Sequence, residues 1–226
     1  MGDYKKSLSS NFQVSLLDAE KIDQAVAMFL DAFKNEAFTE ALIDLSIPAN
    51  HDIYSQITKY RLSFYLEIGH RVFTALDGDN VVGMAILKSP HVKIPKLLIL
   101  RRAILHLTAF ARMLLLGMRA SHLNAAINPP DNLPAKHYTL EGFAVNPAYQ
   151  GKGIGRLLLE QIEQTCAEDH ASSGIYLVTA DEKNKEIYQH FNYSIIEIRP
   201  TNHFIACHFF KKKEMIKEGI GGIENR

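Results

Sequence analysis

The segment from Leu140 to Arg156 constrains the fold of this chain more than any other. An apolar run ending at Val145 is typical of a buried strand, and Asn146-Pro147 then breaks it. A loop with three glycines follows, and the apolar spacing from 153 to 169 predicts a helix. Glycines let backbone N–H groups approach a ligand, and a helix N-terminus adds unpaired N–H groups and partial positive charge. The segment therefore predicts a strand, loop and helix that bind a phosphate or diphosphate.

Two common nucleotide motifs do not fit this loop. A Walker A loop requires Lys followed by Ser or Thr, and no such pair follows a suitable glycine here. The dinucleotide motif GxGxxG is met at Gly151 and Gly153, but its third glycine is replaced by Arg156. The pattern that remains is Q-x-x-G-x-G, which runs from Gln150 to Gly155.

Strands and helices alternate along the chain, which predicts a mixed α/β fold around one sheet. The 226 residues, 47% of them hydrophobic, supply enough apolar side chains for one core. We expect a single domain over 1–226, with a helical insertion at about 94–127 and a charged, fraying tail at about 212–226. The predicted strands are 12–17, 71–76, 81–88, 137–145, 175–179, 194–198 and 204–210, and the predicted helices are 18–33, 39–45, 53–69, 96–126, 153–169 and 184–191.

The charge and cysteine content exclude several classes of protein. Lys plus Arg and Asp plus Glu both number 25, whereas a nucleic-acid-binding protein usually carries a basic excess. Two cysteines without a CxxC pair predict neither a disulfide framework nor a zinc site. The uncharged run Ala103–Ala111 is far shorter than the about 20 residues of a membrane span. We expect a cytoplasmic protein with no metal, no nucleic-acid partner and no membrane span.

The glycine loop and a later segment resemble the GNAT superfamily of N-acetyltransferases, which transfer an acyl group from coenzyme A (CoA) to an amine. Q-x-x-G-x-G after a strand is similar to the family's cofactor loop, and Asn184 with Tyr188 is similar to its later Asn-x-x-x-Tyr segment. The run from His137 to Leu140 looks like the small-molecule branch that includes puromycin N-acetyltransferase. The resemblance implies a mostly antiparallel central sheet flanked by helices, with a helical insertion after the third strand.

The resemblance also implies acetyl-CoA as cosubstrate and a role for each residue of the loop. The backbone of residues 143–145 would pair with the pantetheine arm as an added strand does. N–H groups of residues 150–155 would hold the pyrophosphate, and Lys152 and Arg156 would add positive charge. The implied cofactor-binding residues are Phe143, Ala144, Val145, Gln150, Gly151, Lys152, Gly153, Ile154, Gly155, Arg156 and Asn184.

Two residues are candidates for catalysis. By the resemblance, Tyr188 would donate a proton to the departing CoA thiolate. The attacking amine must lose a proton, and alkyl amines have a pKa of about 10, so a base is needed. Glu141 is the one carboxylate on the central strand, two residues before Phe143 and therefore expected on the same face. His137 and Tyr138 are alternative bases.

Three functions remain open from the sequence. The first is acetyl transfer to the amine of a small molecule by direct attack. The second is a non-catalytic module that binds or senses CoA, and the third is an acetyltransferase of a peptide or protein amine. No cysteine stands out as a nucleophile.

The helical insertion is the most asymmetric part of the chain in charge. Between Asp79 and Asp131 there are seven basic residues and no acidic one. Three interpretations are open: a solvated face of helices on the sheet, a wall over the acceptor site, or a surface for an anionic membrane. Its leucines are too many for one narrow stripe, so we expect them to be buried against the protein or a partner chain. A homodimer seam is one form of the latter.

Overall fold

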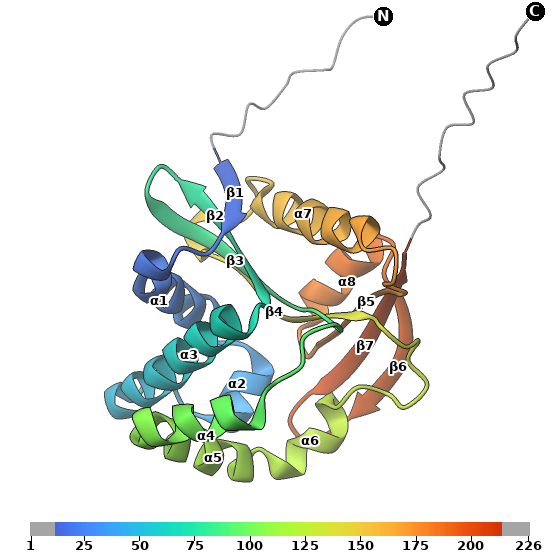
Figure 1. Ribbon diagram of the computed structural model, residues 1–226. Helices are drawn as coiled ribbons and strands as arrows, with labels where there is room; N and C mark the ends of the chain where they lie inside the picture. Colours follow the sequence, from blue (N-terminus) through green and yellow to red (C-terminus); the bar gives the residue numbers. More distant parts are fainter. Residues whose placement is uncertain (1–11, 214–226) are drawn as a thin grey trace, which may run out of the picture.

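The computed structural model describes residues 12–213, and in this part of the chain seven strands form one sheet in the order β1-β2-β3-β4-β5-β7-β6 (Figure 1). The strands are β1 (Phe12–Leu16), β2 (Arg71–Asp77), β3 (Asn80–Lys88), β4 (Tyr138–Val145), β5 (Gly174–Thr179), β6 (Ser194–Pro200) and β7 (Ile205–Lys212). The helices are α1 (Ile22–Phe33), α2 (Ala37–Leu42), α3 (Pro48–Ile68), α4 (Lys96–Leu105), α5 (Leu107–Arg119), α6 (Ser121–Ile127), α7 (Ile154–Glu168) and α8 (Glu182–His190), with short 3-10 helices η1 (Ala19–Lys21) and η2 (Pro147–Tyr149).

Strand direction follows from the connections. Every neighbouring pair is antiparallel except β4 and β5, which are parallel. A parallel pair needs a long crossover, which α7 provides, whereas β2 and β3 are joined by the short turn predicted from the Asp-Gly pair. The fold is a mixed α/β sheet, mostly antiparallel and flanked by helices, which confirms the predicted fold class.

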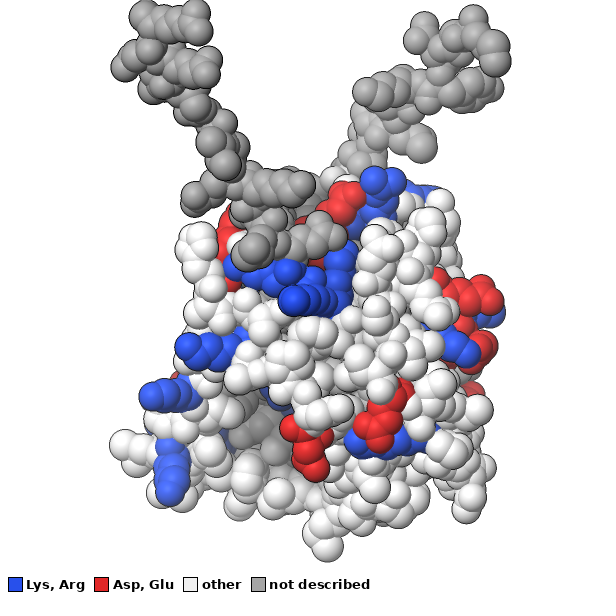
Figure 2. All heavy atoms as spheres, turned by 90° about the vertical axis from the view of Figure 1, so that its right-hand side faces the viewer, with Lys and Arg blue, Asp and Glu red and all other residues white. Residues whose placement is uncertain are grey.

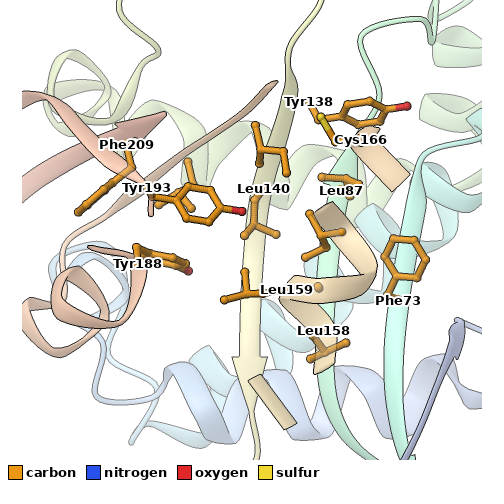
Figure 3. Packing of buried hydrophobic residues seen from close by; sticks show 14 of the residues in the cluster. Phe73, Leu87, Tyr138, Leu140, Leu158, Leu159, Cys166, Tyr188, Tyr193 and Phe209 are labelled. Atoms are coloured by element: carbon orange, nitrogen blue, oxygen red, sulfur yellow. The ribbon is translucent and has the colours of Figure 1, made fainter. Parts of the chain in front are cut away.

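Helices cover both faces of the sheet (Figure 1). Successive residues of a strand point to opposite faces, so β3 contributes to two apolar clusters. Ala85 and Leu87 lie in the cluster that contains the buried side of α7 (Figure 3). Met84 and Ile86 lie in the cluster formed with α1 and α3. The sheet thus separates an α7 side from an α1/α3 side, and β4 lies between them.

The predicted helical stretch over 96–126 is divided into three helices. His106 (φ −125°, ψ 43°) separates α4 from α5, and Ala120 separates α5 from α6. α4 and α5 lie on the outer side of α3 and not on the sheet (Figure 1). Contacts between polar side chains join them to α3, such as Arg102 with Glu67 and Arg112 with Gln56.

Most leucines of the insertion are not buried against the described part of the chain, and burial against a partner chain stays a prediction. Ten large apolar side chains between 94 and 118 are 40% exposed or more. They are Ile94, Leu97, Ile99, Leu100, Ile104, Leu105, Leu107, Leu114, Leu115 and Met118.

Two predicted boundaries at the C-terminal end also change. β7 continues to Lys212, so the ladder includes the first residue of the predicted tail; residues 214–226 of that tail lie outside the described residues. α8 begins at Glu182 and not at Asn184, because the side chain of Asp181 caps the helix by accepting a hydrogen bond from the Lys183 N–H (2.7 Å).

Candidate active site

β4 and β5 pair over only three residues and then diverge. Tyr138–Leu140 pairs with Ile175–Leu177, and no further pair follows. From Gly142 to Val145, β4 pairs with β3 on one edge, and no described strand pairs with its other edge. Buried backbone N–H and C=O groups require partners, so this edge suits an extended ligand that carries amide groups. Phe143, Ala144 and Val145 all lie on this open part of β4.

The turn after β4 is shaped by local hydrogen bonds and by glycine. Asn146 donates its N–H to Val82 O (2.9 Å), and its Oδ1 accepts a hydrogen bond from the Ala148 N–H (3.0 Å). Gly151 (φ +77°) and Gly153 (φ +83°) adopt the left-handed conformation that other residues avoid. A Cβ at either position would meet nothing within 4 Å, so the backbone conformation, and not crowding, requires glycine there.

The loop leaves a run of backbone amides free. Its hydrogen bonds end at Gln150, whose N–H donates to Pro147 O (3.4 Å), and resume at Leu157, whose N–H donates to Gly153 O (3.1 Å). The amides from Gly151 to Arg156 donate to no acceptor among the described residues, and no side chain caps α7. Free amides at a helix N-terminus bind anions well. The predicted diphosphate cradle therefore fits the geometry of residues 151–156.

The two basic residues of the loop, Lys152 and Arg156, each contact a neighbouring side chain. Lys152 Nζ lies 4.3 Å from the centre of the Tyr149 ring, and Arg156 pairs with Glu160 (2.7 Å) while 71% of its side chain is exposed. Arg156 also lines a cavity of about 310 Å³ together with Lys211 and the end of α8. Lys and Arg side chains gather near the end of the described chain (Figure 2).

Tyr188 is held in an aromatic cluster beside the opening between β4 and β5. Its ring lies 6.2 Å from that of Phe143, 5.7 Å from that of Tyr193 and 5.8 Å from that of Phe209. The hydroxyl ends of Tyr188 and Tyr193 point toward β4 (Figure 3). Burial raises the pKa of Tyr188, so its hydroxyl stays protonated at neutral pH. Asn184 lies one turn earlier on the same face of α8 and is half-buried.

Glu141 does not share a face with Phe143, which corrects the prediction from strand alternation. Opposite Glu141 the register shifts, with Ile86 facing Gly142 and Leu87 facing Leu140. Glu141 is thus the extra residue of a β-bulge, and a bulge reorients the side chains beside it. Phe143 packs on the α7 side, whereas Glu141 points to α3.

The carboxylate of Glu141 is surrounded by donors. It pairs with Arg61 and with Lys88 (3.2 Å), and it accepts a hydrogen bond from the Tyr65 hydroxyl (2.6 Å). Burial acts to raise the pKa of Glu141, but the charges of Arg61 and Lys88 prevail and lower it to about 2. A carboxylate with so low a pKa is a weak proton acceptor. Its predicted role as the base stays a prediction.

The two alternative bases lie at the other end of β4. Tyr138 is buried near Cys166 (Figure 3), and His137 is hydrogen-bonded to Pro134 O (2.8 Å). His137 precedes the stretch where β4 and β5 are paired, and Tyr138 is the first residue of that pairing. At about 3.4 Å per residue, Tyr138 lies roughly 14 Å along β4 from Gly142, where the free edge begins. This distance separates both residues from the free edge.

Comparison with known proteins tests the predicted family. The model of the acetyltransferase (GNAT) family matches residues 39–193, from α2 to just beyond α8. This chain belongs to the GNAT family. The match confirms the family prediction, and family and fold together indicate an N-acetyltransferase that uses acetyl-CoA. The narrower likeness to puromycin N-acetyltransferase stays a prediction. No curated protein matches the sequence.

Solved structures share the fold of this GNAT protein at low sequence identity. An acetyltransferase from Corynebacterium glutamicum, described as histone acetyltransferase HPA2 and related acetyltransferase, is 15% identical, with a TM-score of 0.62 over 91% of this chain and 98% of that one. Arylalkylamine N-acetyltransferase 2 from Aedes aegypti is 13% identical, with a TM-score of 0.59 over 90% and 100%. The C-terminal condensation domain of Ebony, in complex with beta-alanyl-dopamine, is 12% identical, with a TM-score of 0.60 over 89% and 98%.

Two further features of the GNAT protein concern metals and membranes. Among residues 12–213, no three His, Cys, Asp or Glu side chains gather in a way that would hold a metal ion. None of the helices in that range combines the length and the apolar character needed to cross a bilayer.

The ion pairs of Glu141 predict an acid-sensitive stability. The pKa of this group falls from 4.5 to about 2 on folding, so its stabilisation is complete above pH 4.5 and is lost as the pH falls toward 2. A shift of this size corresponds to about 3 kcal/mol. Urea unfolding between pH 6 and pH 3 should show wild type losing stability faster than Glu141→Gln. Asp31→Asn, in an exposed pair with Lys34, is the control, and its free energy of unfolding should depend on pH as that of wild type does. The same pH dependence in all three proteins would contradict the prediction.

Proposed function

We propose that this GNAT protein transfers the acetyl group of acetyl-CoA to the amine of a small molecule by direct attack. One observation carries the proposal: the free edge of β4 runs directly into the free amides of residues 151–156. An extended ligand that carries amides along its arm and a diphosphate at its end matches both features.

In this proposal the protein holds the cofactor mainly with its backbone. The main chain of Phe143, Ala144 and Val145 pairs with the pantetheine amides. The amides from Gly151 to Arg156 bind the diphosphate, and Gln150 with Lys152 borders them. Asn184, half-buried on α8, forms a hydrogen bond with the pantetheine arm. Acetyl-CoA supplies the activated acyl group as a thioester.

Tyr188 acts as the proton donor in the proposed reaction. The amine nitrogen forms a bond to the acetyl carbon while the carbon–sulfur bond breaks, so the amine loses a proton and the sulfur gains one. The Tyr188 hydroxyl donates to the sulfur, and the proton of the amine passes to water or to a base. Glu141 is the candidate base, and it also fixes Arg61 and Lys88 on the α3 side of the opening.

The covering of Glu141 favours a small acceptor. Helix α3 places Arg61 and Tyr65 directly on the carboxylate, and only 21% of the Glu141 side chain is exposed. A folded protein surface would have to displace α3 to reach it. The fold alone does not distinguish a small acceptor from a protein acceptor, because similar structures include an arylalkylamine N-acetyltransferase and a ribosomal-protein-S18-alanine N-acetyltransferase.

The proposed function is tested in two steps with purified protein. Calorimetry with CoA measures binding, and release of free thiol measures turnover with a panel of small amines and, in a separate arm, peptides with free N-termini or lysines. We expect CoA binding and turnover with members of the small-amine panel. Binding without turnover in either arm would favour a non-catalytic CoA module, turnover with peptides alone would overturn the acceptor class, and no binding would overturn the cofactor.

A further inference from the structure

Helix α4 carries a buried charged side chain on its inner face and exposed apolar side chains on its outer face, the reverse of the usual pattern for a helix in water. Arg102 is only 9% exposed and faces α3, where its guanidinium donates to Glu67 (2.5 Å) and to Ser63 Oγ (3.0 Å). The outer face carries Leu97 (76% exposed) and Ile104 (68% exposed). A surface helix of a globular protein normally turns its apolar face inward. The arrangement in α4 indicates an apolar environment on the outer side.

The neighbouring helix α5 also carries exposed apolar side chains. Leu107 and Leu115 are 66% and 59% exposed, and α5 contacts both α4 and α3. The two helices lie at the lower edge of the molecule in Figure 1, away from β4. We call the exposed apolar residues of 94–115 on these helices the α4–α5 surface. Contiguous apolar surfaces of this kind mark interaction sites.

Positive charge predominates around the α4–α5 surface. Lys93 and Lys96 are exposed and form no ion pair with a described residue, and Arg101 is 61% exposed. No acidic residue occurs between Asp79 and Asp131. Glu67, the carboxylate of α3 next to this surface, is already bound by Arg101 and Arg102. The α4–α5 surface therefore combines aliphatic side chains with two lysines, Lys93 and Lys96, that form no ion pair with a described residue.

We propose that the α4–α5 surface docks on an anionic lipid bilayer. Aliphatic residues enter the boundary between headgroups and acyl chains, and lipid phosphates meet Lys93, Lys96 and Arg101, as in helices that lie in the plane of a membrane. A second copy of this chain fits less well. A two-fold interface brings the surface of one copy against the same surface of the other, which has no acidic residue to pair with the lysines.

Vesicle flotation of the full chain tests this proposal. Wild type is mixed with vesicles of phosphatidylcholine alone, or with phosphatidylglycerol added to about one third. We expect flotation with the anionic vesicles that weakens with added salt. The variant Leu97→Glu/Leu100→Glu/Ile104→Glu should bind these vesicles at least about 100-fold less tightly. Ile198→Glu, which changes an exposed apolar residue on β6, is the matched control and should float like wild type.

A second variant tests the electrostatic part. Lys93→Gln/Lys96→Gln should lower the partition onto anionic vesicles by about fivefold per lysine and leave neutral vesicles unaffected. All variants should bind CoA as wild type does, so the result is independent of the proposed acetyl transfer. Absence of flotation, or equal flotation of the triple variant, would overturn the proposal. So would a dimer in sedimentation that the triple variant disperses without any lipid binding, because a second copy would then cover the surface.

Discussion

Replacement of Tyr188 with phenylalanine is expected to lower kcat by about 100-fold or more, with little change in the KM for acetyl-CoA. The substitution removes one hydroxyl and keeps the ring, so packing against Phe143 and Phe209 is preserved. The hydroxyl makes no hydrogen bond to any described residue, so its loss leaves no buried partner unsatisfied. In the proposed mechanism the variant loses its proton donor, and the raised pKa of Tyr188 keeps that hydroxyl protonated throughout the neutral range.

Two measurements separate chemistry from packing in this prediction. Tyr193→Phe removes the hydroxyl of the neighbouring ring, which is buried without a hydrogen-bond partner, and should keep kcat within about twofold. An acetyl thioester of a more acidic thiol needs no proton on its departing sulfur. With this substrate, the difference in kcat between Tyr188→Phe and wild type should be smaller. A Tyr188→Phe enzyme with wild-type kcat on acetyl-CoA would remove Tyr188 from the mechanism.

The glycine loop could be predicted from sequence because its determinants are local. Positive φ values at Gly151 and Gly153 depend on the residue itself, and the free amides follow from the start of α7. The order of strands and helices was predictable for the same reason, since hydrophobic periodicity is a property of each segment. These local signals located the candidate cofactor loop, and the likeness to the GNAT family rests on the same residues.

The surroundings of Glu141 could not be predicted, because they depend on residues far away in the chain. Alternation along β4 places Glu141 with Phe143, but the register with β3 inserts a bulge at this position. Its ion-pair partners come from Arg61, 80 residues earlier, and from Lys88. The outward leucines of α4 were missed for a related reason. The hydrophobic pattern predicts burial, but Arg102 takes the inner face through contacts with α3.

The second large effect is expected from Gly153→Val, which should weaken CoA binding by about 100-fold. A β-branched residue does not adopt a φ of +83°, so the backbone must rotate at this position. The N–H groups of residues 151–156 would then no longer point together toward the diphosphate. Hydrogen bonds to a charged group contribute about 1.5–3 kcal/mol each, and the loss of one or two of them accounts for the factor. Calorimetry with CoA measures the change directly.

The matched control for Gly153→Val is Gly69→Val. Gly69 has nearly the same φ (+87°) and equal free space, but it ends α3 and lies outside the loop. Both variants should lose similar stability, so a loss of affinity in the loop variant alone cannot come from general unfolding. Acetyl-pantetheine, which lacks the diphosphate, should bind Gly153→Val as tightly as wild type, because the free edge of β4 is unchanged. Equal weakening of acetyl-pantetheine and acetyl-CoA would mean that the amides of residues 151–156 do not hold the diphosphate.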